Sequence, residues 1–578
     1  MILLTCTLGL LPVGVRADSG LPQVEQSVEA WYVVRDWVTD FALPDAGSPA
    51  AETGIDDAFA CCLILRQGGR VVGIGTSMET EGRMLHRATT HALSMALADP
   101  ALQALPEDIR ASIGSKLTVE LEITGPMQPL IGRTPSEFQD DIHPLRHGLA
   151  LRWDDQWSMK FPCRLRGMNR RPDVSMLDGM AISIGLGSGL RDALERDGIA
   201  AYRFRTIDLA QVEPDEPPQL VVGGTMKQPP ALPDADDLAM ARDSLLDHVR
   251  ARLWPGEEPL GLVGSYDPAA DQYTPIVAST LDQALTAWAL GRAASSSSLD
   301  RPSREAALDA ASEIIVASLS VQETTAVEDA AIILALQSND ELDPHEAAAA
   351  IGPRRQRILE EATNWLEADG ETTPFGHDLA LIAFALTGTG EASDRTMASL
   401  LADLAWERTP IARQVSLMPW IAWTELSLGR REKLDSLREL RQLILERQVP
   451  PGDERFGAEL SGGIVLGKLP VHVTAKSLRP FAALPAMYRH DRITTAEDRD
   501  EQLARMRFAM RFLMQLQVGE DDAGLYRTPA RVSGGIRMAP WDARMPTSAQ
   551  AMALVTLSDV IDLMPSKSPL PSQGDGVY

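Results

Sequence analysis

A motif that occurs twice near the C-terminus constrains the fold of this chain more than any other feature. Both copies begin with Gly-Gly-Ile, at residues 462–464 and at residues 534–536. Each copy continues through an irregular polar stretch that contains a proline. Each then reaches a Thr-capped, Ala/Leu-rich segment typical of a helix, at residues 474–484 and 547–554. Self-similarity of this kind indicates a repeat architecture.

The two copies lie in a region where apolar residues recur at helical spacing. The spacing predicts twelve helices, near residues 237–252, 279–293, 303–320, 324–337, 344–368, 376–388, 395–406, 410–428, 431–447, 474–487, 495–517 and 547–563. Twelve helices taken in pairs give six helical hairpins. We expect these to close into an (α/α)6 toroid over residues 237–565, and the doubled motif favours closure. An open solenoid of hairpins is the alternative.

The second copy resembles the end of a repeat in the terpene cyclase/prenyltransferase toroid superfamily. Such repeats run from a Leu-Gln helix end through an acidic-glycine turn and an extended crossing to a Thr- or Ser-capped inner helix. Residues 515–517, 521–524 and 547–557 fill these roles here. The resemblance implies the toroid fold and not the chemistry. Protein prenyltransferases need an Asp/Cys/His zinc site, and no cysteine follows Cys163. Terpene cyclases need an aromatic-rich cavity, and aromatic residues make up only 5% of this chain.

The first part of the chain, residues 20–212, predicts an α+β domain with short antiparallel strands. A helical pattern follows Gln23, and strand patterns at residues 59–65 and 70–76 flank a Gln-Gly-Gly turn. The pattern then predicts a helix from about residue 82 to residue 97, strands at 117–123 and 148–153, and a helix near 188–197.

The order of these elements resembles the AMME-chromosomal-region (AMMECR) domain family over roughly residues 55–207. The matching motifs are Ile74-Gly75-Thr76, Asp99-Pro100, Leu121-Glu122-Ile123, His147-Gly148-Leu149, Phe161-Pro162 and Tyr202-Arg203-Phe204. The family's hallmark Leu-Arg-Gly-Cys-Ile-Gly corresponds to residues 70–75, where Gly73 replaces the cysteine. The resemblance therefore implies a fold and little chemistry.

Other segments predict the organisation around these domains. Residues 1–17 have the apolar core and Val-x-Ala end of a signal peptide, which predicts an extracytoplasmic (periplasmic or secreted) protein. A misplaced start or a buried strand is the alternative, because no Lys or Arg precedes the apolar run. Residues 213–236 form a Pro-rich linker, and residues 566–578 a disordered tail. The linker ends in Asp234-Ala235-Asp236-Asp237, which we interpret as a helix cap rather than as a cyclase general acid.

Charge and cysteine usage exclude several classes of function. With 54 Lys and Arg against 81 Asp and Glu, the formal charge is −27, which disfavours nucleic acids and anionic membrane surfaces. No later apolar run is long enough for stable membrane insertion. Cys61 and Cys62 are adjacent on a strand and point to opposite faces, so at most one of them can meet Cys163. We expect buried thiols, no metal site and no cofactor.

If the toroid has a site, the crossings that enter its inner helices should form the mouth. We therefore nominate His472 and Asp542 as catalytic proton-transfer groups. Ligand-binding candidates are Lys476, Arg537, Trp541 and Gln550. The alternative is that these side chains satisfy backbone groups of the crossings themselves.

The first function hypothesis is a ligand-binding or assembly protein that uses the toroid cavity or the domain interface. Its partner would be an unknown small molecule, a glycan or another protein. The second is a toroid enzyme that acts on a polysaccharide, as a glycosidase or lyase, or on an isoprenoid. A glycosidase would need two carboxylates facing one cavity, whereas a filled cavity would argue against an enzyme.

Overall fold

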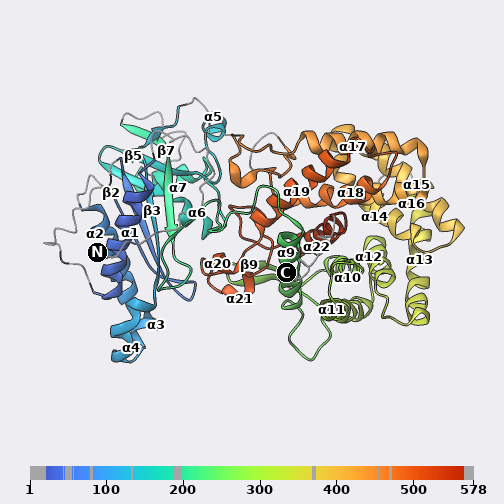
Figure 1. Cartoon of the computed structure of the whole chain (residues 1–578), viewed down its shortest axis with the longest axis horizontal. Helices are drawn as coiled ribbons and strands as arrows, with labels where there is room; N and C mark the ends of the chain where they lie inside the picture. Colours follow the sequence, from blue (N-terminus) through green and yellow to red (C-terminus); the bar gives the residue numbers. More distant parts are fainter. Residues whose placement is uncertain are drawn as a thin grey trace, which may run out of the picture. The chain divides into compact units, whose positions relative to one another are not determined.

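A computed structural model describes residues 21–42, 45, 55, 57–78, 83–131, 135–186, 198–367, 373–453, 455–467 and 472–564. The chain is multidomain and forms two compact units (Figure 1). The first contains the described residues up to Leu165 together with residues 172–221, and the second contains residues 166–171 and those from Val222 onward. The predicted signal peptide, the helix near 188–197 and the C-terminal tail lie outside the described residues.

The first unit is an α/β region built on an antiparallel sheet. In the order in which they pair, its strands are β2 (Arg70–Met78), β1 (Ala60–Gln67), β3 (Thr118–Thr124), β7 (Ile199–Ala210), β5 (His147–Trp153) and β6 (Gln156–Lys160). The short strands β4 (Gln128–Pro129) and β8 (Gln219–Leu220) also pair with β7. Because β7 pairs with β5 through residues 199–205 and with β3 through residues 206–210, the sheet bends along this strand into a half-barrel.

Helices cover this sheet and complete its core. They are α1 (Val24–Thr39), α2 (Met84–Leu97), α3 (Pro100–Gln103), α4 (Glu107–Ser112), α5 (Pro135–Asp140), α6 (Pro162–Arg166) and α7 (Met176–Ser183). Cys61 packs in one apolar cluster with residues of α1 and α2, whereas Cys62 and Cys163 pack in another. The predicted opposite orientation of the adjacent cysteines is confirmed, and all three cysteines are buried and belong to no disulfide.

Two glycines of β2 have a packing reason in this chain. A Cβ at Gly73 would lie 2.2 Å from the carbonyl oxygen of Ala92 in α2, and one at Gly75 would lie 1.8 Å from that of Ala88. Strand β2 therefore approaches the backbone of α2 too closely for any larger residue at either position.

The second unit is predominantly helical, and each of the twelve predicted helical segments contains a helix within the described residues. These helices are α9 (Ala235–Arg250), α10 (Thr280–Ala294), α11 (Arg301–Leu319), α12 (Ala326–Ser338), α13 (Pro344–Glu367), α14 (Gly376–Thr387), α15 (Ala392–Arg408), α16 (Trp420–Leu428), α17 (Leu434–Glu446), α18 (Leu478–Arg489), α19 (Arg499–Leu516) and α22 (Thr547–Ile561). The first begins at a capping box in which Asp234 accepts from the amides of Asp236 and Asp237. The predicted cap is thus confirmed.

The sequence pattern did not predict four smaller elements of this unit. A hairpin of β9 (Val263–Asp267) and β10 (Gln272–Val277) precedes α10, and the short helices α20 (Glu520–Ala523) and α21 (Pro529–Val532) precede α22. The β10 side chains are mostly exposed and include Pro275, so the strand lacks the alternation that identifies a half-buried strand.

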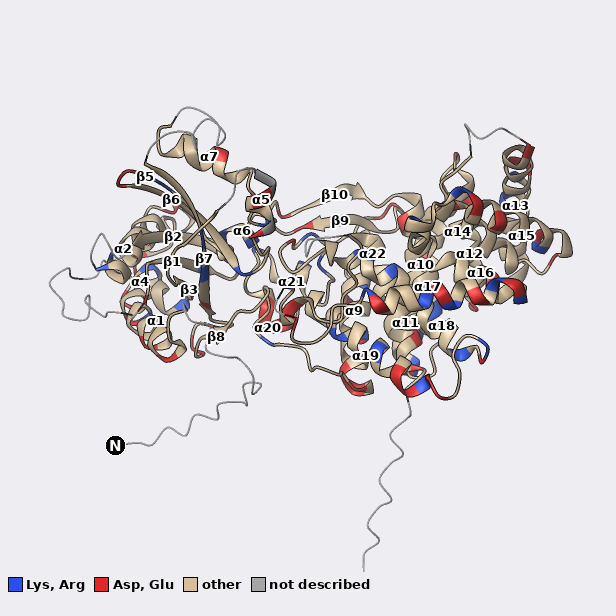
Figure 2. Cartoon of the chain, turned by 90° about the horizontal axis from the view of Figure 1, so that it is seen from above, with Lys and Arg blue, Asp and Glu red and all other residues tan. Residues whose placement is uncertain are grey.

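Six of the helices contact one another in a closed order, and we call them the ring helices. Contacts run from α10 to α12, α14, α16, α18 and α22, and from α22 back to α10. All but two of the fifteen residues of α22 are buried, as expected for a helix that is covered on every side. Figure 2 shows charged residues gathered on helices outside this set, such as α13, α15 and α17, whereas α22 is almost free of them.

The doubled Gly-Gly-Ile motif forms the same backbone structure twice. Val449 exchanges two backbone hydrogen bonds with residues 462–463, at 3.0 and 2.8 Å, and Val518 does so with residues 534–535, at 2.8 and 2.9 Å. In both copies the residue before this valine, Gln448 or Gln517, donates its side-chain amide to the carbonyl of the first glycine. The motif therefore fastens the residue that follows α17 or α19 to the segment that leads to α18 or α22.

A third copy of this pairing is present without the sequence motif. Trp254 donates to the carbonyl of Gly261 at 2.8 Å, and Val263 donates to that of Arg252 at 3.0 Å. Leu253 and Leu262 occupy the positions of Gln448 and Ile464 in the first copy. Because these residues share neither the glycine pair nor the glutamine, sequence comparison within the chain could not detect this copy.

Candidate functional site

The residues nominated in the first crossing are exposed. His472 packs its ring against Gly467, where an added Cβ would lie 2.3 Å from the imidazole. Lys476 lies in a short turn that is capped by the Thr474 hydroxyl. The backbone amide of Ala475 donates to the carbonyl of Met538 at 2.8 Å, so the two crossings contact each other.

Two candidates in the second crossing are buried and bind backbone groups. The guanidinium of Arg537 donates to the carbonyls of Gln515 at 2.6 Å and Leu516 at 3.3 Å, and also to those of Gly224 and Pro540. The amide of Gln550 bonds both the N–H and the C=O of Ile536. Arg537 and Gln550 therefore satisfy backbone groups, which is the alternative to a ligand-binding role.

Trp541 and Asp542 also lie in the second crossing and are largely buried. The carboxylate of Asp542 accepts from the Nε of Arg544 at 2.9 Å. Arg544 in turn lines a shallow pocket of about 410 Å³ together with Asn169, Arg170 and Asp267. The nominated proton-transfer groups His472 and Asp542 therefore differ in environment, since one is exposed and the other is held in an ion pair.

A different group of titratable side chains lies at the N-terminal ends of two ring helices. The rim cluster consists of Phe375, His377 and Asp378 at the start of α14, and Arg479 in the first turn of α18. The Nε2 atom of His377 lies 3.3 Å from Oδ1 of Asp378. The rings of Phe375 and His377 stack with centroids 5.9 Å apart at an interplanar angle of 9°. Phe375 is 77% exposed, so its free ring face is open to a ligand.

Burial dominates the electrostatics of the rim cluster. It lowers the pKa of His377, with smaller effects from Asp378, which raises it, and Arg479, which lowers it. Burial also raises the pKa of Asp378, against the lowering effects of His377 and Arg479. The pKa of Arg479 is lowered by burial and raised by the charge of Asp378. Within the described part of the chain, the Arg479 guanidinium makes no hydrogen bond or ion pair.

Four aromatic rings pack together among the ring helices. Trp288 of α10 lies 5.4 Å, between ring centroids, from both Trp420 and Trp423 of α16, and Phe384 of α14 lies 5.4 Å from Trp423. The three tryptophans are almost fully buried. Since α10 and α16 are three steps apart in the closed contact order, this aromatic cluster spans the interior between them.

Three buried carboxylates of the helical unit are already paired with arginines. Asp329 is held by Arg357 at 2.7 Å, and Asp394 is held by Arg355 at 2.5 Å. Glu425 binds Arg430 at 2.5 Å and also accepts from the indole of Trp406. The charge of each of these carboxylates is therefore balanced by an arginine of the helical unit.

The sequence reasoning missed the rim cluster although the chain carried a signal for it. The prediction that crossings into inner helices form the mouth rests on the two Gly-Gly-Ile copies. The crossing Thr373-Pro374-Phe375-Gly376 enters α14 in the same way and leads directly to His377 and Asp378. Among the described residues, no group of three or more His, Cys, Asp or Glu side chains is arranged to hold a metal ion.

Comparisons with known proteins add little to this description. No protein-family model matches the chain, and no curated protein matches it. Among solved structures, the chain is similar to an uncharacterized protein from Pyrococcus horikoshii, with 16% sequence identity and a TM-score of 0.26. The match covers 35% of this chain and 98% of that one. A likeness this low carries no argument about fold or function. Across the described residues, no helix combines the length and apolar character needed to cross a bilayer.

Proposed function

We propose that the helical unit is an (α/α)6 toroid that binds a ligand without transforming it, and that the rim cluster is its binding surface. The closed contact order of the six ring helices supports the toroid. The aromatic cluster that spans the interior and the arginine-paired carboxylates support a binding module over an enzyme with two free catalytic carboxylates.

Arg479 is the observation that carries this proposal. Its guanidinium is partly buried and makes no hydrogen bond to a described residue, so N–H groups are left without a partner, and burial lowers its pKa. An anionic oxygen pair supplied by a ligand would restore the missing hydrogen bonds in a bidentate geometry. The stacked rings of Phe375 and His377 offer a flat face beside it, which suits a sugar ring. The ligand class is therefore a carboxylate-bearing sugar or glycan.

Calorimetric titration of the full chain with glucuronate tests this function. Glucuronate should bind at least about 10-fold more tightly than glucose, because only the acid can pair with the guanidinium. Arg479→Gln should remove this preference. Arg489→Gln, at the exposed C-terminal end of the same helix, is the matched control and should not change binding. Equal affinity for acid and neutral sugar, or unchanged binding in Arg479→Gln, would contradict the proposal.

The His377–Asp378 pair favours a second candidate function, the eliminative cleavage of an acidic polysaccharide. A neutral imidazole oriented by a carboxylate can take the proton from the carbon next to a carboxylate that Arg479 neutralises. The bond to the leaving sugar oxygen would then break and leave a carbon–carbon double bond, and that oxygen would take the proton from the imidazolium. Ultraviolet absorbance of the conjugated product from polygalacturonate or alginate tests this candidate. Glucuronate binding without such a product would contradict the cleavage function and favour the binding function.

For the first unit we propose an AMMECR-like fold. The six motifs that carry the resemblance fall, in chain order, on β2, the start of α3, β3, β5, the start of α6 and β7. The close approach of β2 to α2 accounts for the glycine that replaces the hallmark cysteine. We further propose export, which would expose the rim cluster to extracytoplasmic glycans. N-terminal sequencing of the mature chain tests export, since an intact Met1 would contradict it.

A further inference from the structure

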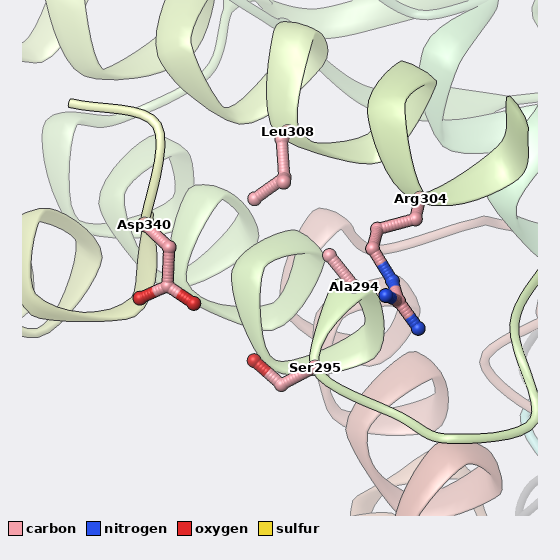
Figure 3. Close-up of a pocket in the computed structure, with 5 residues that line it drawn as sticks. All are labelled: Ala294, Ser295, Arg304, Leu308 and Asp340. Carbon is pink, nitrogen blue, oxygen red and sulfur yellow. The ribbon is translucent and has the colours of Figure 1, made fainter. Parts of the chain in front are cut away.

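A second small pocket lies at the C-terminal end of α10, whereas the rim cluster lies at the N-terminal ends of ring helices. Its volume is about 270 Å³, and its lining residues are Ala294, Ser295, Arg304, Leu308 and Asp340. Figure 3 shows Arg304 and Asp340 on opposite sides of this pocket, with Leu308 and Ser295 between them on facing walls. One positive and one negative group thus face the same small space across an apolar side chain.

The basic wall is built on the first turn of α11. This helix begins at an Asp300 cap that accepts from the amide of Ser303 at 2.8 Å, which fixes the backbone beside Arg304. The guanidinium of Arg304 donates one hydrogen bond, to the carbonyl of Ser296 at 3.3 Å. Among the described residues it has no acidic partner, so its remaining N–H groups are available to a ligand.

The acidic wall follows α12 and is held in place by its neighbour. The buried side chain of Asn339 donates to the hydroxyl of Ser312 at 2.9 Å and accepts from the amide of Glu341 at 3.1 Å. These bonds anchor to α11 the turn that presents Asp340. The carboxylate of Asp340 makes no hydrogen bond or ion pair with the residues that the structure describes.

We propose that this pocket binds a free α-amino acid with a small apolar side chain. The carboxylate of the amino acid would pair with Arg304, and its ammonium group with Asp340. Ser295 donates its hydroxyl proton to the carbonyl of Gly291 at 3.0 Å, so the hydroxyl oxygen is free to accept from the same ammonium group. The side chain of the amino acid would lie against Leu308.

A zwitterion suits this pocket better than a single ion does. A lone anion or a lone cation would pair with one wall and leave the other charge unpartnered across a small space. A molecule that carries both charges in one rigid frame satisfies both walls at once, and the bonds described above fix the backbone that carries each wall. The volume is also that of a small metabolite and not of a polymer segment.

Titration of the full chain with L-alanine, followed by nuclear magnetic resonance or calorimetry, tests this inference. Saturable binding is expected for L-alanine, with at least about 10-fold weaker binding of acetate and of methylammonium, each of which carries one of the two charges. Arg304→Gln and Asp340→Asn should each weaken L-alanine binding by about 10-fold or more. Both residues are exposed, and unchanged melting temperatures will establish that the variants fold.

Two control variants separate this site from other effects. Arg301→Gln removes an exposed arginine of the same helix and should leave L-alanine binding unchanged. Arg479→Gln should also leave L-alanine binding unchanged, because this pocket does not depend on the rim cluster. The inference is overturned if L-alanine shows no saturable binding, or if Arg304→Gln and Asp340→Asn bind it as well as the natural chain does.

Discussion

The side chain of Gln550 in α22 holds both backbone polar groups of Ile536. Its Oε1 accepts from the Ile536 amide at 2.7 Å, and its Nε2 donates to the Ile536 carbonyl at 2.8 Å. In the first copy of the motif, the hydroxyl of Ser477 makes the equivalent contacts to Ile464, at 3.2 and 3.3 Å. A polar side chain at the start of a ring helix thus closes each copy of the motif.

Removing the Gln550 clamp should destabilise the helical unit. Gln550→Ala leaves the buried N–H and C=O of Ile536 without partners and creates a cavity, which we expect to cost about 2–4 kcal/mol in the free energy of unfolding. Ser477→Ala removes longer bonds from a smaller side chain and should cost about 1 kcal/mol. Urea denaturation followed by tryptophan fluorescence measures both values. A smaller loss for Gln550→Ala than for Ser477→Ala would contradict the role of the clamp.

The first glycine of the second motif should tolerate no side chain. Gly534 has a φ of +77°, and an added Cβ would lie 2.2 Å from the carbonyl oxygen of Ser244. Gly534→Ala combines strained backbone with this clash and should lower the free energy of unfolding by about 3 kcal/mol or more. Gly429 has a similar φ of +70° with open space around it. Gly429→Ala should therefore cost only about 1 kcal/mol, and equal losses in the same denaturation experiment would contradict the clash.

The pattern of apolar residues was sufficient to predict the helical unit but not how its side chains meet. Helix α22 was predictable because thirteen of its fifteen residues are buried, so its apolar signal is strong. The third backbone pairing, at Trp254 and Gly261, was not, because backbone hydrogen bonds place few demands on residue type. The part of the rim cluster at the start of α14 was predictable, since the segment before this helix is also a crossing of the kind expected to form the site. The proximity of Asp378 and Arg479 depends on the closed order of the ring helices, which no local pattern contains.

The buried imidazole of His248 should make the helical unit sensitive to acid. Burial lowers its pKa from 6.5 to about 3, and its Nδ1 bonds the carbonyl of Ser533 at 3.0 Å. Between these two pH values the unfolded chain binds a proton that the folded chain excludes. The neutral His248 side chain therefore contributes fully to the free energy of unfolding above pH 6.5. This contribution is lost progressively as the pH falls toward 3, by up to about 5 kcal/mol.

An asparagine at this position isolates the effect. His248→Asn keeps a donor near Nδ1 for the Ser533 carbonyl and cannot titrate in this range. The difference in unfolding free energy between the natural chain and the variant should shift in favour of the variant as the pH is lowered from 7 to 4. Parallel loss of stability in both chains over this interval would show that His248 does not contribute to acid sensitivity.

Replacing Arg479 with an apolar residue should stabilise the unliganded protein. A partly buried guanidinium with no hydrogen bond inside the described chain carries a desolvation cost that the charge of Asp378 offsets only in part, so Arg479→Met should raise the free energy of unfolding by about 1 kcal/mol. Arg511 is the contrasting case, because it is also buried but donates to the carbonyl of Ser461 at 3.2 Å and interacts with the charge of Glu459. Arg511→Met should destabilise by about 2 kcal/mol, since it removes the hydrogen bond to Ser461 and the attraction to Glu459. Urea denaturation of both variants, together with glucuronate titration of Arg479→Met, separates a structural role for Arg479 from a binding role. Gain of stability with loss of glucuronate binding is the expected result, and a destabilised Arg479→Met would identify a structural arginine instead.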